Sequence, residues 1–254
     1  MIPAERQRAI IALLGSEKVI SFNKLADQLA VSHMTIRRDI TSLEAQGKVV
    51  SVSGGVQLSE TLMHEPSHDA KRSLHHGEKV AIGRKAAELI AKESCIYLDA
   101  GTTTLEVAHH ISQRDDLLVV TNDFMIISFL MNNSGCELYH TGGRVDRKNK
   151  SCVGDKAARM LKSINIDLAF VSTSSWDQRG ITTPSEDKVL VKQAIVNAAL
   201  KSVLVSDSSK YGRMATFNAI ALERFDSIIS DSSLSETGCI EVQKRGITLH
   251  LAEV

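Results

Sequence analysis

The stretch VSHMTIRRDI, residues 31–40, decides how the first part of the chain folds. Ser32 follows a short break and is a good N-cap for a helix, because its hydroxyl can accept a hydrogen bond from an amide of the first turn. Ile36, Ile40 and Leu43 follow the spacing of four and three residues that places side chains on one helical face. The pattern predicts a short amphipathic helix with these three residues inside.

The same helix directs two adjacent arginines away from its apolar face. At about 100° per residue, Arg38 points away from the apolar stripe and Arg37 lies on its flank. Guanidinium groups can donate in a fork to phosphate oxygens or to the edge of guanine, and His33 and Thr35 can add hydrogen bonds. Met34 can lie against a thymine methyl group. We predict that this surface contacts DNA.

Two further helices and a hairpin accompany this helix. Residues 3–14 begin with proline and stop at a glycine, and residues 21–30 place apolar side chains on one face behind a serine cap. Residues 48–58 alternate valine with polar residues around two glycines, as β-hairpins do. This order predicts a winged helix-turn-helix, whose third helix enters the major groove and whose wing lies over the phosphate backbone. We expect the DNA contacts to come from Ser32, His33, Met34, Thr35, Arg37, Arg38 and Lys48.

The charge of the whole chain does not identify a partner. The 254 residues are 43% hydrophobic, enough for a small and a large domain, and 30 basic side chains balance 30 acidic ones. Residues 1–58 hold seven basic and five acidic side chains, which is only a slight positive excess. The position of the charge is therefore more informative than its amount.

Several kinds of site and location are not indicated. No apolar run approaches the roughly 20 residues that span a bilayer, and the first residues lack a secretory apolar segment, so we expect a cytoplasmic protein. The four cysteines lack metal-ligand spacing, and the adjacent histidines at 75–76 and 109–110 point about 100° apart on a helix. We expect no metal, no disulfide and no cofactor.

The remainder of the chain predicts a second, larger domain. Residues 59–79 are polar and lack a clear period, so we interpret them as a linker. Residues 80–254 alternate helical stretches with short apolar runs, which indicates an α/β domain with a mainly parallel sheet. The apolar runs are CIYLD, LLVVT, ELYHT, DLAFVS, SVLVSD, SIISD and ITLHL.

Polar residues follow several of these predicted strands. In DAGTTT, residues 99–104, the glycine permits close backbone approach and the threonines open a helix, so amides, hydroxyls and the positive helix end meet at one anion-sized position. Ligands of open α/β sheets bind outside the carboxyl ends of the strands. We therefore predict a phosphate-binding ligand site there, with further polar strand ends at residues 121–123, 141–144 and 207–210.

Residues farther along the chain leave two readings open. Glu186 lies in a loop or first turn and Lys192 on the helix that follows, where they could contact a ligand or form an ordinary surface pair. Trp176, the only tryptophan, could stack on a ligand or pack in the core.

Taken together, these motifs resemble those of the DeoR family of transcriptional regulators over nearly the full chain. The first domain carries the resemblance in residues 32–39, Leu43-Glu44, Gly47 and Gly54-Gly55. The second carries it in LDAGTTT, VVTND, HTGGRV, the Gly154 region, ITTPSEDKVLVKQAI and SDSSKYGR, which match a sensor module similar in fold to ribose-5-phosphate isomerase.

The resemblance implies a repressor of a carbohydrate catabolism operon, whose operator affinity changes when the second domain binds a phosphorylated sugar or sugar acid. By the same resemblance, the phosphate loop would consist of Asp99, Gly101, Thr102 and Thr103. The rest of the effector would be surrounded by Asn122, Asp123, Gly142, Gly143, Glu186, Lys192 and Lys210.

The chain departs from the family pattern at two places. Residues 172–177 read STSSWD where the family usually has Gly-x-Asp-Gly-Ile-Asp, so an acid and two glycines are lost. Ser53 stands just before the wing glycines, where the family tends to have an aromatic or basic residue, which predicts weaker contact of the wing with DNA.

Two other functions compete with this interpretation. A sugar-phosphate isomerase with an appended DNA-binding domain would need a base and an oxyanion donor, for which Glu186 and Lys192 are available, but the change at residues 172–175 removes an acid. A constitutive regulator with a degenerate sensor is opposed by the intact DAGTTT loop. Because one small winged helix reads few base pairs, a regulator of this kind should act as a homodimer or homotetramer on a double-stranded operator.

Overall fold

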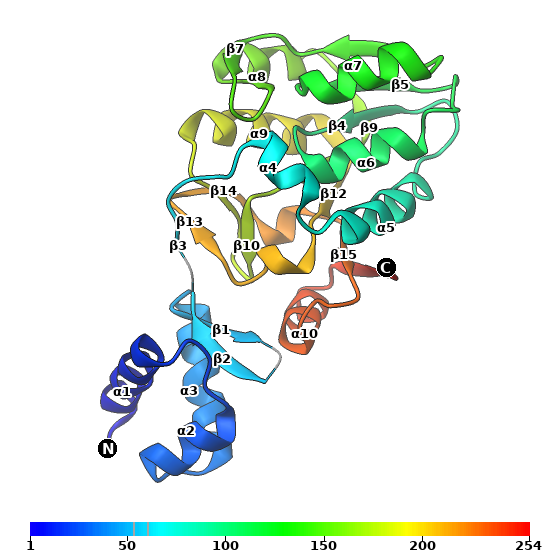
Figure 1. Cartoon of the computed structure of the whole chain (residues 1–254). Helices are drawn as coiled ribbons and strands as arrows, with labels where there is room; N and C mark the ends of the chain where they lie inside the picture. The colour runs from blue at the N-terminus through cyan, green and yellow to red at the C-terminus, as the bar shows by residue number, and fades with distance from the viewer. Residues whose placement is uncertain (53, 60) are drawn as a thin grey trace.

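A computed structural model describes residues 1–52, 54–59 and 61–254, and the prediction about Ser53 lies outside these residues. The N-terminal domain is a winged helix-turn-helix, as predicted, and Figure 1 shows it below the larger domain. Its three helices and antiparallel hairpin are α1 (Pro3–Ser16), α2 (Phe22–Leu29), α3 (His33–Ala45), β1 (Val49–Val52) and β2 (Gly55–Leu58).

Local sequence signals set the helix ends of this domain. Ser21 and Ser32 are the N-caps of α2 and α3, and each hydroxyl accepts a hydrogen bond from an amide of the first turn. The apolar residues of α3 are buried in one core with those of α1, α2 and the hairpin. A buried ion pair, Arg6 with Asp39, joins α1 to α3 and was not predicted.

The larger domain is built on one seven-stranded sheet in which every neighbouring pair is parallel. Its strands, in spatial order, are β16 (Thr248–Ala252), β15 (Ser227–Asp231), β12 (Ala199–Val205), β9 (Ile166–Ser172), β4 (Cys95–Leu98), β5 (Leu118–Thr121) and β6 (Glu137–His140). These are the seven apolar runs of the sequence, so the predicted parallel sheet is confirmed.

Helices cover both faces of this sheet and give the domain two cores. One face packs against α5 (His76–Ala87), α6 (Thr102–His110) and α7 (Phe124–Asn133). The other packs against α8 (Asp155–Leu161), α9 (Glu186–Ala198) and α10 (Glu236–Lys244). Alternate side chains of each strand point to opposite faces, which explains why the central strands are largely apolar while the edge strands β6 and β16 carry polar residues.

Several short elements were not predicted. A three-stranded antiparallel sheet, two short ladders, one helix and two turns of 3₁₀ helix surround the main sheet. They are β10 (Ser175–Asp177), β11 (Gly180–Thr183) and β14 (Phe217–Ala221); β7 (Arg144–Asp146) with β8 (Ser151–Val153); β3 (Thr61–Leu62) with β13 (Met214–Ala215); α4 (His68–Ser73); and η1 (Ser208–Lys210) and η2 (Leu222–Arg224). Residues 59–79, interpreted above as a linker, thus contain β3, α4 and the start of α5.

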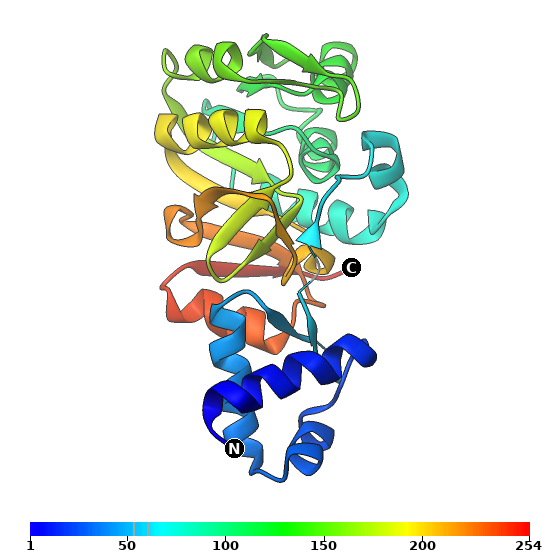
Figure 2. The same ribbon diagram turned by 90° about the vertical axis from the view of Figure 1, so that its left-hand side faces the viewer.

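Where the two domains meet, each contributes a glycine that lies against a side chain of the other domain. A Cβ on Gly212 would lie 2.0 Å from Val50 of β1, and a Cβ on Gly47 would lie 2.3 Å from the Arg179 guanidinium. Val50 is buried without belonging to the winged-helix core, because it packs against the larger domain. Figure 2 shows the hairpin and α10 at this junction.

Candidate DNA surface and effector cavity

The N-terminal half of α3 presents an exposed polar surface. Arg37 and Arg38 are both exposed, and no hydrogen bond or ion pair joins either side chain to another described residue. His33 is exposed and lies 5.9 Å from the ring of Phe22, and Met34 is 62% exposed. The arginines are therefore free to meet a phosphate or a base edge.

The remaining predicted DNA contacts have different surroundings. Ser32 accepts a hydrogen bond from the Thr35 amide at 3.2 Å, and their hydroxyls are 2.9 Å apart, so both polar groups already stabilise the helix end. Lys48 is exposed next to β1. Arg37 also borders a groove between the winged helix and α10, whose other wall includes Glu241 and Lys244.

The strand order of the large sheet changes direction between β4 and β9. From β4 the chain continues through β5 to β6 on one side, and from β9 through β12 to β15 and β16 on the other. Such switch points are where open α/β sheets bind ligands. A cavity of about 290 Å³ lies there, lined by Gly101, Thr102 and Thr103 at the start of α6 and by residues 172–174 after β9.

The start of α6 is shaped for a close approach by an anion. Gly101 leaves no room for a side chain, since a Cβ there would lie 2.8 Å from the Ser172 hydroxyl. Thr103 lines this cavity, and its hydroxyl is buried and has no hydrogen-bond partner among the described residues. By contrast, the Thr104 hydroxyl donates to the carbonyl of Asp99 at 2.6 Å. Thr103 is thus the hydroxyl left for a ligand, beside the amides of the first helical turn.

Positive side chains line the opposite wall of the cavity. They are Lys71 and Lys79 from the segment after the wing, and Lys210 and Arg213 from the segment after β12. Burial lowers the pKa of Lys71 to about 8, and burial together with the charge of Lys210 lowers the pKa of Lys79 to about 8. The lining holds only two carboxylates, Glu65 and Asp207, so the cavity has an excess of positive charge that suits an anion.

A smaller polar cavity of about 20 Å³ lies deeper, next to the first. Asp99 and Lys192 meet there in a buried ion pair with 2.5 Å between Oδ2 and Nζ. The Asn122 side chain accepts a hydrogen bond from the Tyr97 hydroxyl and donates to the Cys152 carbonyl. These predicted effector residues therefore stabilise one another and the neighbouring backbone.

The structure divides the predicted effector residues into three groups. The main cavity is lined by Gly101, Thr102, Thr103 and Lys210. The deeper cavity is lined by Asp99, Asn122 and Lys192. Neither cavity is lined by Asp123, Gly142, Gly143 or Glu186.

The residues that line neither cavity either make contacts within the protein or lie on its surface. Asp123 caps α7 and also accepts a hydrogen bond from the Gly101 amide at 3.1 Å, and burial raises the pKa of its carboxyl to about 6. It thereby holds the loop before α6 in place. Gly142 and Gly143 form a turn with positive φ after the edge strand β6, and Glu186 is exposed in the first turn of α9.

Residues 172–177, where the chain departs from the family pattern, contribute both to the cavity and to the core. Ser172 donates from its hydroxyl to the Ala100 carbonyl at 2.7 Å, which ties β9 to the loop after β4. Trp176 is completely buried and packs edge-on against Tyr211 at 4.8 Å between ring centroids. Of the two readings left open for this tryptophan, the packed one is correct.

The sequence interpretation missed Glu65, Lys71, Lys79, Lys188 and Arg213. The first three belong to residues 59–79, whose lack of a hydrophobic period suggested a linker. A local signal existed there, because the serine before α4 caps it and two basic residues follow in its last turn. Nothing local indicated that this helix would cover the cavity.

This arrangement defines a class of protein: a DNA-binding regulator with an exposed recognition helix and a second domain that contains a cavity lined by cations. Comparison with known protein families finds a match for each of the two domains. Residues 6–61 match the DeoR-like helix-turn-helix domain, and residues 74–232 match the DeoR C terminal sensor domain. The chain belongs to the DeoR family of transcriptional regulators.

Relatives that match most or all of the chain are named as transcriptional regulators or repressors. A Haemophilus influenzae protein named as an uncharacterized HTH-type transcriptional regulator is 53% identical, over 99% of this chain and 98% of that protein. The HTH-type transcriptional regulator YgbI of Escherichia coli is 51% identical, over 100% and 99%. The glycerol-3-phosphate regulon repressor of E. coli is 29% identical, over 91% and 92%. The protein is a regulator and not an enzyme, so the isomerase alternative is not retained.

Solved structures give a partial likeness. Ribose 5-phosphate isomerase A from Methanocaldococcus jannaschii aligns over 54% of this chain and 55% of its own with a TM-score of 0.41 and 14% identity.

Within the part of the chain that the structure describes, the helices are too short or too polar to cross a membrane.

Proposed function

We propose that this regulator represses a carbohydrate catabolism operon and that a phosphorylated sugar or sugar acid in the sensor domain changes its affinity for the operator. The observation that carries the proposal is a cation-lined cavity at the switch point of the sheet, in the same chain as an exposed recognition helix. One relative is named a repressor of the glycerol-3-phosphate regulon, which concerns a phosphorylated three-carbon compound.

The DNA-binding part of the proposal assigns base contacts to the start of α3. Arg37 and Arg38 would reach phosphates or guanine edges, with His33 and Met34 beside them. Ser32 and Thr35 would hold the helix end, and Lys48 would neutralise a phosphate near the wing. Residues 1–58 would act as the DNA-binding unit and residues 80–254 as the sensor unit, joined by residues 59–79.

The sensor part assigns the effector phosphate to the start of α6. Amides of Thr102 and Thr103 and the Thr103 hydroxyl would bind its oxygens, and Lys210 would balance its charge. Asp99, Asn122 and Lys192 would form the floor beneath the sugar portion, and Asp123 would keep the loop in position. Gly142, Gly143 and Glu186 line neither cavity, so we assign them no contact with the effector.

The regulator would act as a homodimer or homotetramer in the cytoplasm. A recognition helix reads only a few base pairs, so a useful specificity ratio requires paired half-sites on one operator. Sedimentation of the protein with and without a DNA duplex that contains the upstream region of its own operon would measure the number of copies that bind.

A thermal-shift titration tests the effector assignment. Phosphorylated and unphosphorylated sugars are compared on the wild-type chain and on Thr102→Ala and Thr103→Ala. The proposal expects stabilisation by at least one sugar phosphate, none by its unphosphorylated form, and a reduced effect in both variants. Stabilisation by no sugar phosphate would favour a regulator with a degenerate sensor.

A further inference from the structure

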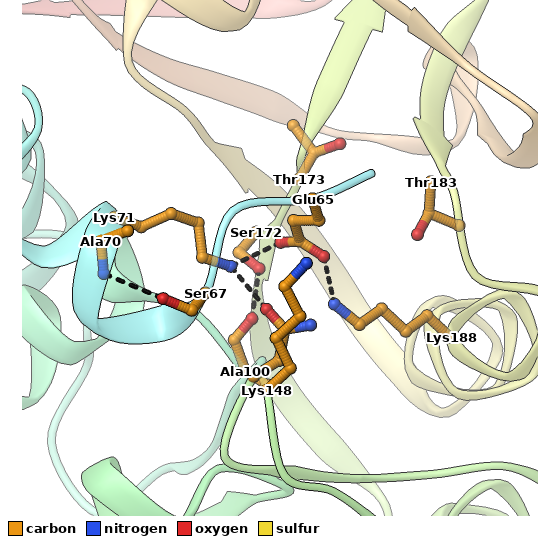
Figure 3. A network of polar contacts seen from close by, with 12 residues as sticks. Glu65, Ser67, Ala70, Lys71, Ala100, Lys148, Ser172, Thr173, Thr183 and Lys188 are labelled. Carbon is orange, nitrogen blue, oxygen red and sulfur yellow. Dashed lines mark hydrogen bonds and ion pairs between the residues drawn. The ribbon is translucent and has the colours of Figure 1, made fainter. Parts of the chain in front are cut away.

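Glu65 links two lysines that come from separate parts of the sensor domain. Its Oε1 accepts from Nζ of Lys71 on α4, and its Oε2 accepts from Nζ of Lys188 on α9, both at 2.5 Å (Figure 3). The Glu65 side chain is only 11% exposed. Burial by itself would raise the pKa of this carboxyl, but the two ammonium groups lower it well below its ordinary range. A carboxylate is therefore held inside the site as an anion.

This carboxylate separates the two cavities described above. Glu65 lines both of them, together with Ala100 and residues 172–174. The deeper one has room for about one water molecule. It also contains the hydroxyl of Ser151, which is buried and has no hydrogen-bond partner among the described residues. If Glu65 left its position, the two cavities would become one larger polar pocket.

The charges around Glu65 favour a stronger anion in its place. One carboxylate faces two ammonium groups there, and Lys79 and Lys210 add positive charge nearby. At equal distance a phosphate dianion attracts each ammonium about twice as strongly as a carboxylate does, since the Coulomb energy scales with the charge. The dianion would also repel Glu65 within the same cavity, because both are negative.

Of the three side chains in this cluster, only that of Glu65 comes from a residue outside a helix or strand. Lys188 lies on the 13-residue helix α9, which packs against the sheet. Glu65 lies in irregular chain between β3 and α4, and the backbone of residues 63–66 makes no hydrogen bond to the rest of the described chain. Displacement of Glu65 therefore breaks only side-chain contacts.

We propose that Glu65 is a built-in counter-anion at an effector site formed by Lys71 and Lys188, and that the anionic group of a small phosphomonoester takes its place. This inference rests on the proposed function: the phosphate that the start of α6 would bind on one side would meet Lys71 and Lys188 on the other, once Glu65 has moved from between the two cavities. It adds Lys71 and Lys188 to the effector-binding residues and makes Glu65 a residue that sets the threshold for effector binding.

Displacement of Glu65 would also affect how the wing is held against the sensor domain. The chain leaves β2 at Leu58, the Ser59 amide donates to the Lys48 carbonyl at 3.0 Å, and β3 pairs with β13 only two residues later. Residue 65 is thus seven residues from the hairpin. Loss of the Glu65 contacts loosens the segment that fixes the hairpin to the sensor domain.

Binding of inorganic phosphate to the full chain, measured by isothermal titration calorimetry, tests the proposal. Glu65→Gln removes the competing charge, and we expect it to bind phosphate about tenfold more tightly than wild type. Asp69→Asn is the matched control. Asp69 lies on α4, close to Glu65 in sequence, and pairs with a lysine, Lys150, but it lines neither cavity. Its affinity should equal that of wild type. Equal or weaker binding by Glu65→Gln overturns the proposal.

Hydrogen exchange of the wild-type chain gives a second readout that needs no variant. Saturation with phosphate should speed exchange of the amides in β3, because loss of the Glu65 contact with α9 loosens the segment that follows the strand paired with β13. Slower exchange would mean that the ligand tightens the segment, which contradicts displacement. If the wild-type chain binds no phosphate, the proposed effector function fails as well. If it binds and Glu65→Gln binds no more tightly, only the role of Glu65 fails.

Discussion

Val50 in the wing packs directly on the backbone of Gly212 in the sensor domain, at a position where no side chain larger than hydrogen fits. Gly212 has a φ of +76° and donates its amide to the Trp176 carbonyl at 2.8 Å. Lys210 and Arg213, on either side of it in sequence, line the effector cavity. One short segment thus contacts both the cavity and the DNA-binding domain.

Gly212→Ala should destabilise the junction for two separable reasons. The positive φ costs a residue with a Cβ roughly 1–2 kcal/mol, and the new methyl group overlaps Val50. Val50→Ala in the same chain should recover the steric part and leave the backbone part. Differential scanning calorimetry of wild type, both single variants and the double variant measures this coupling. Strictly additive changes in Tm would show that the two residues do not touch.

Arg37→Ala and Arg38→Ala should each weaken operator binding. Loss of a guanidinium that reaches a base edge should cost roughly 1–3 kcal/mol of specific affinity. Loss of one that reaches only phosphate should cost less and should lower the salt dependence of binding. Fluorescence anisotropy with an operator duplex at several salt concentrations separates the two cases. Lys201→Ala, an exposed cation of the sensor domain, is the control. Unchanged affinity in the double arginine variant would remove α3 as the recognition helix.

Thr103→Val and Thr104→Val should differ in stability. The Thr103 hydroxyl has no partner among the described residues, so its replacement by an isosteric methyl should leave the Tm unchanged or raise it, while phosphate affinity falls about tenfold or more. The Thr104 hydroxyl donates to two carbonyls, and its loss should lower the Tm. Thermal unfolding with and without phosphate tests both. A lower Tm for Thr103→Val without loss of affinity would exclude a ligand role for this hydroxyl.

Anion binding should weaken as pH rises above about 8. Lys71 and Lys79 have pKa values of about 8 instead of 10.5, so they begin to lose their charge there. A bound dianion favours the charged lysines, so binding at pH 8.5 should take up protons. Calorimetry in two buffers of different ionisation enthalpy measures this uptake, and Lys79→Met should reduce it. Equal heats in both buffers would contradict the assignment.

The same two lysines affect stability with the opposite sign. Between pH 8 and 10.5 the unfolded chain binds more protons than the folded chain, because its lysines keep their ordinary pKa. The free energy of unfolding contributed by these groups therefore rises with pH across this window. Chemical denaturation at pH 7.5 and 9.5 checks the direction for wild type against Lys79→Met.

Features set by local chemistry were predictable. Serine caps, the spacing of Ile36, Ile40 and Leu43, and the two wing glycines specified the winged helix. The seven apolar runs specified the strands of the sheet, because strands with helices on both faces are rich in apolar residues. DAGTTT was predicted to form a ligand loop from its glycine and threonines, and the structure places Gly101, Thr102 and Thr103 in the lining of the main cavity.

The sequence by itself therefore determined the two domains, the parallel sheet and the direction in which Arg37 and Arg38 point, because each follows from neighbours a few residues apart. Only the tertiary structure decided which polar residues share the cavity. Lys71 is brought there from a stretch without a hydrophobic period, and Glu186, although it resembles a site residue, lies outside. A cavity between distant segments depends on their packing, which no local pattern encodes.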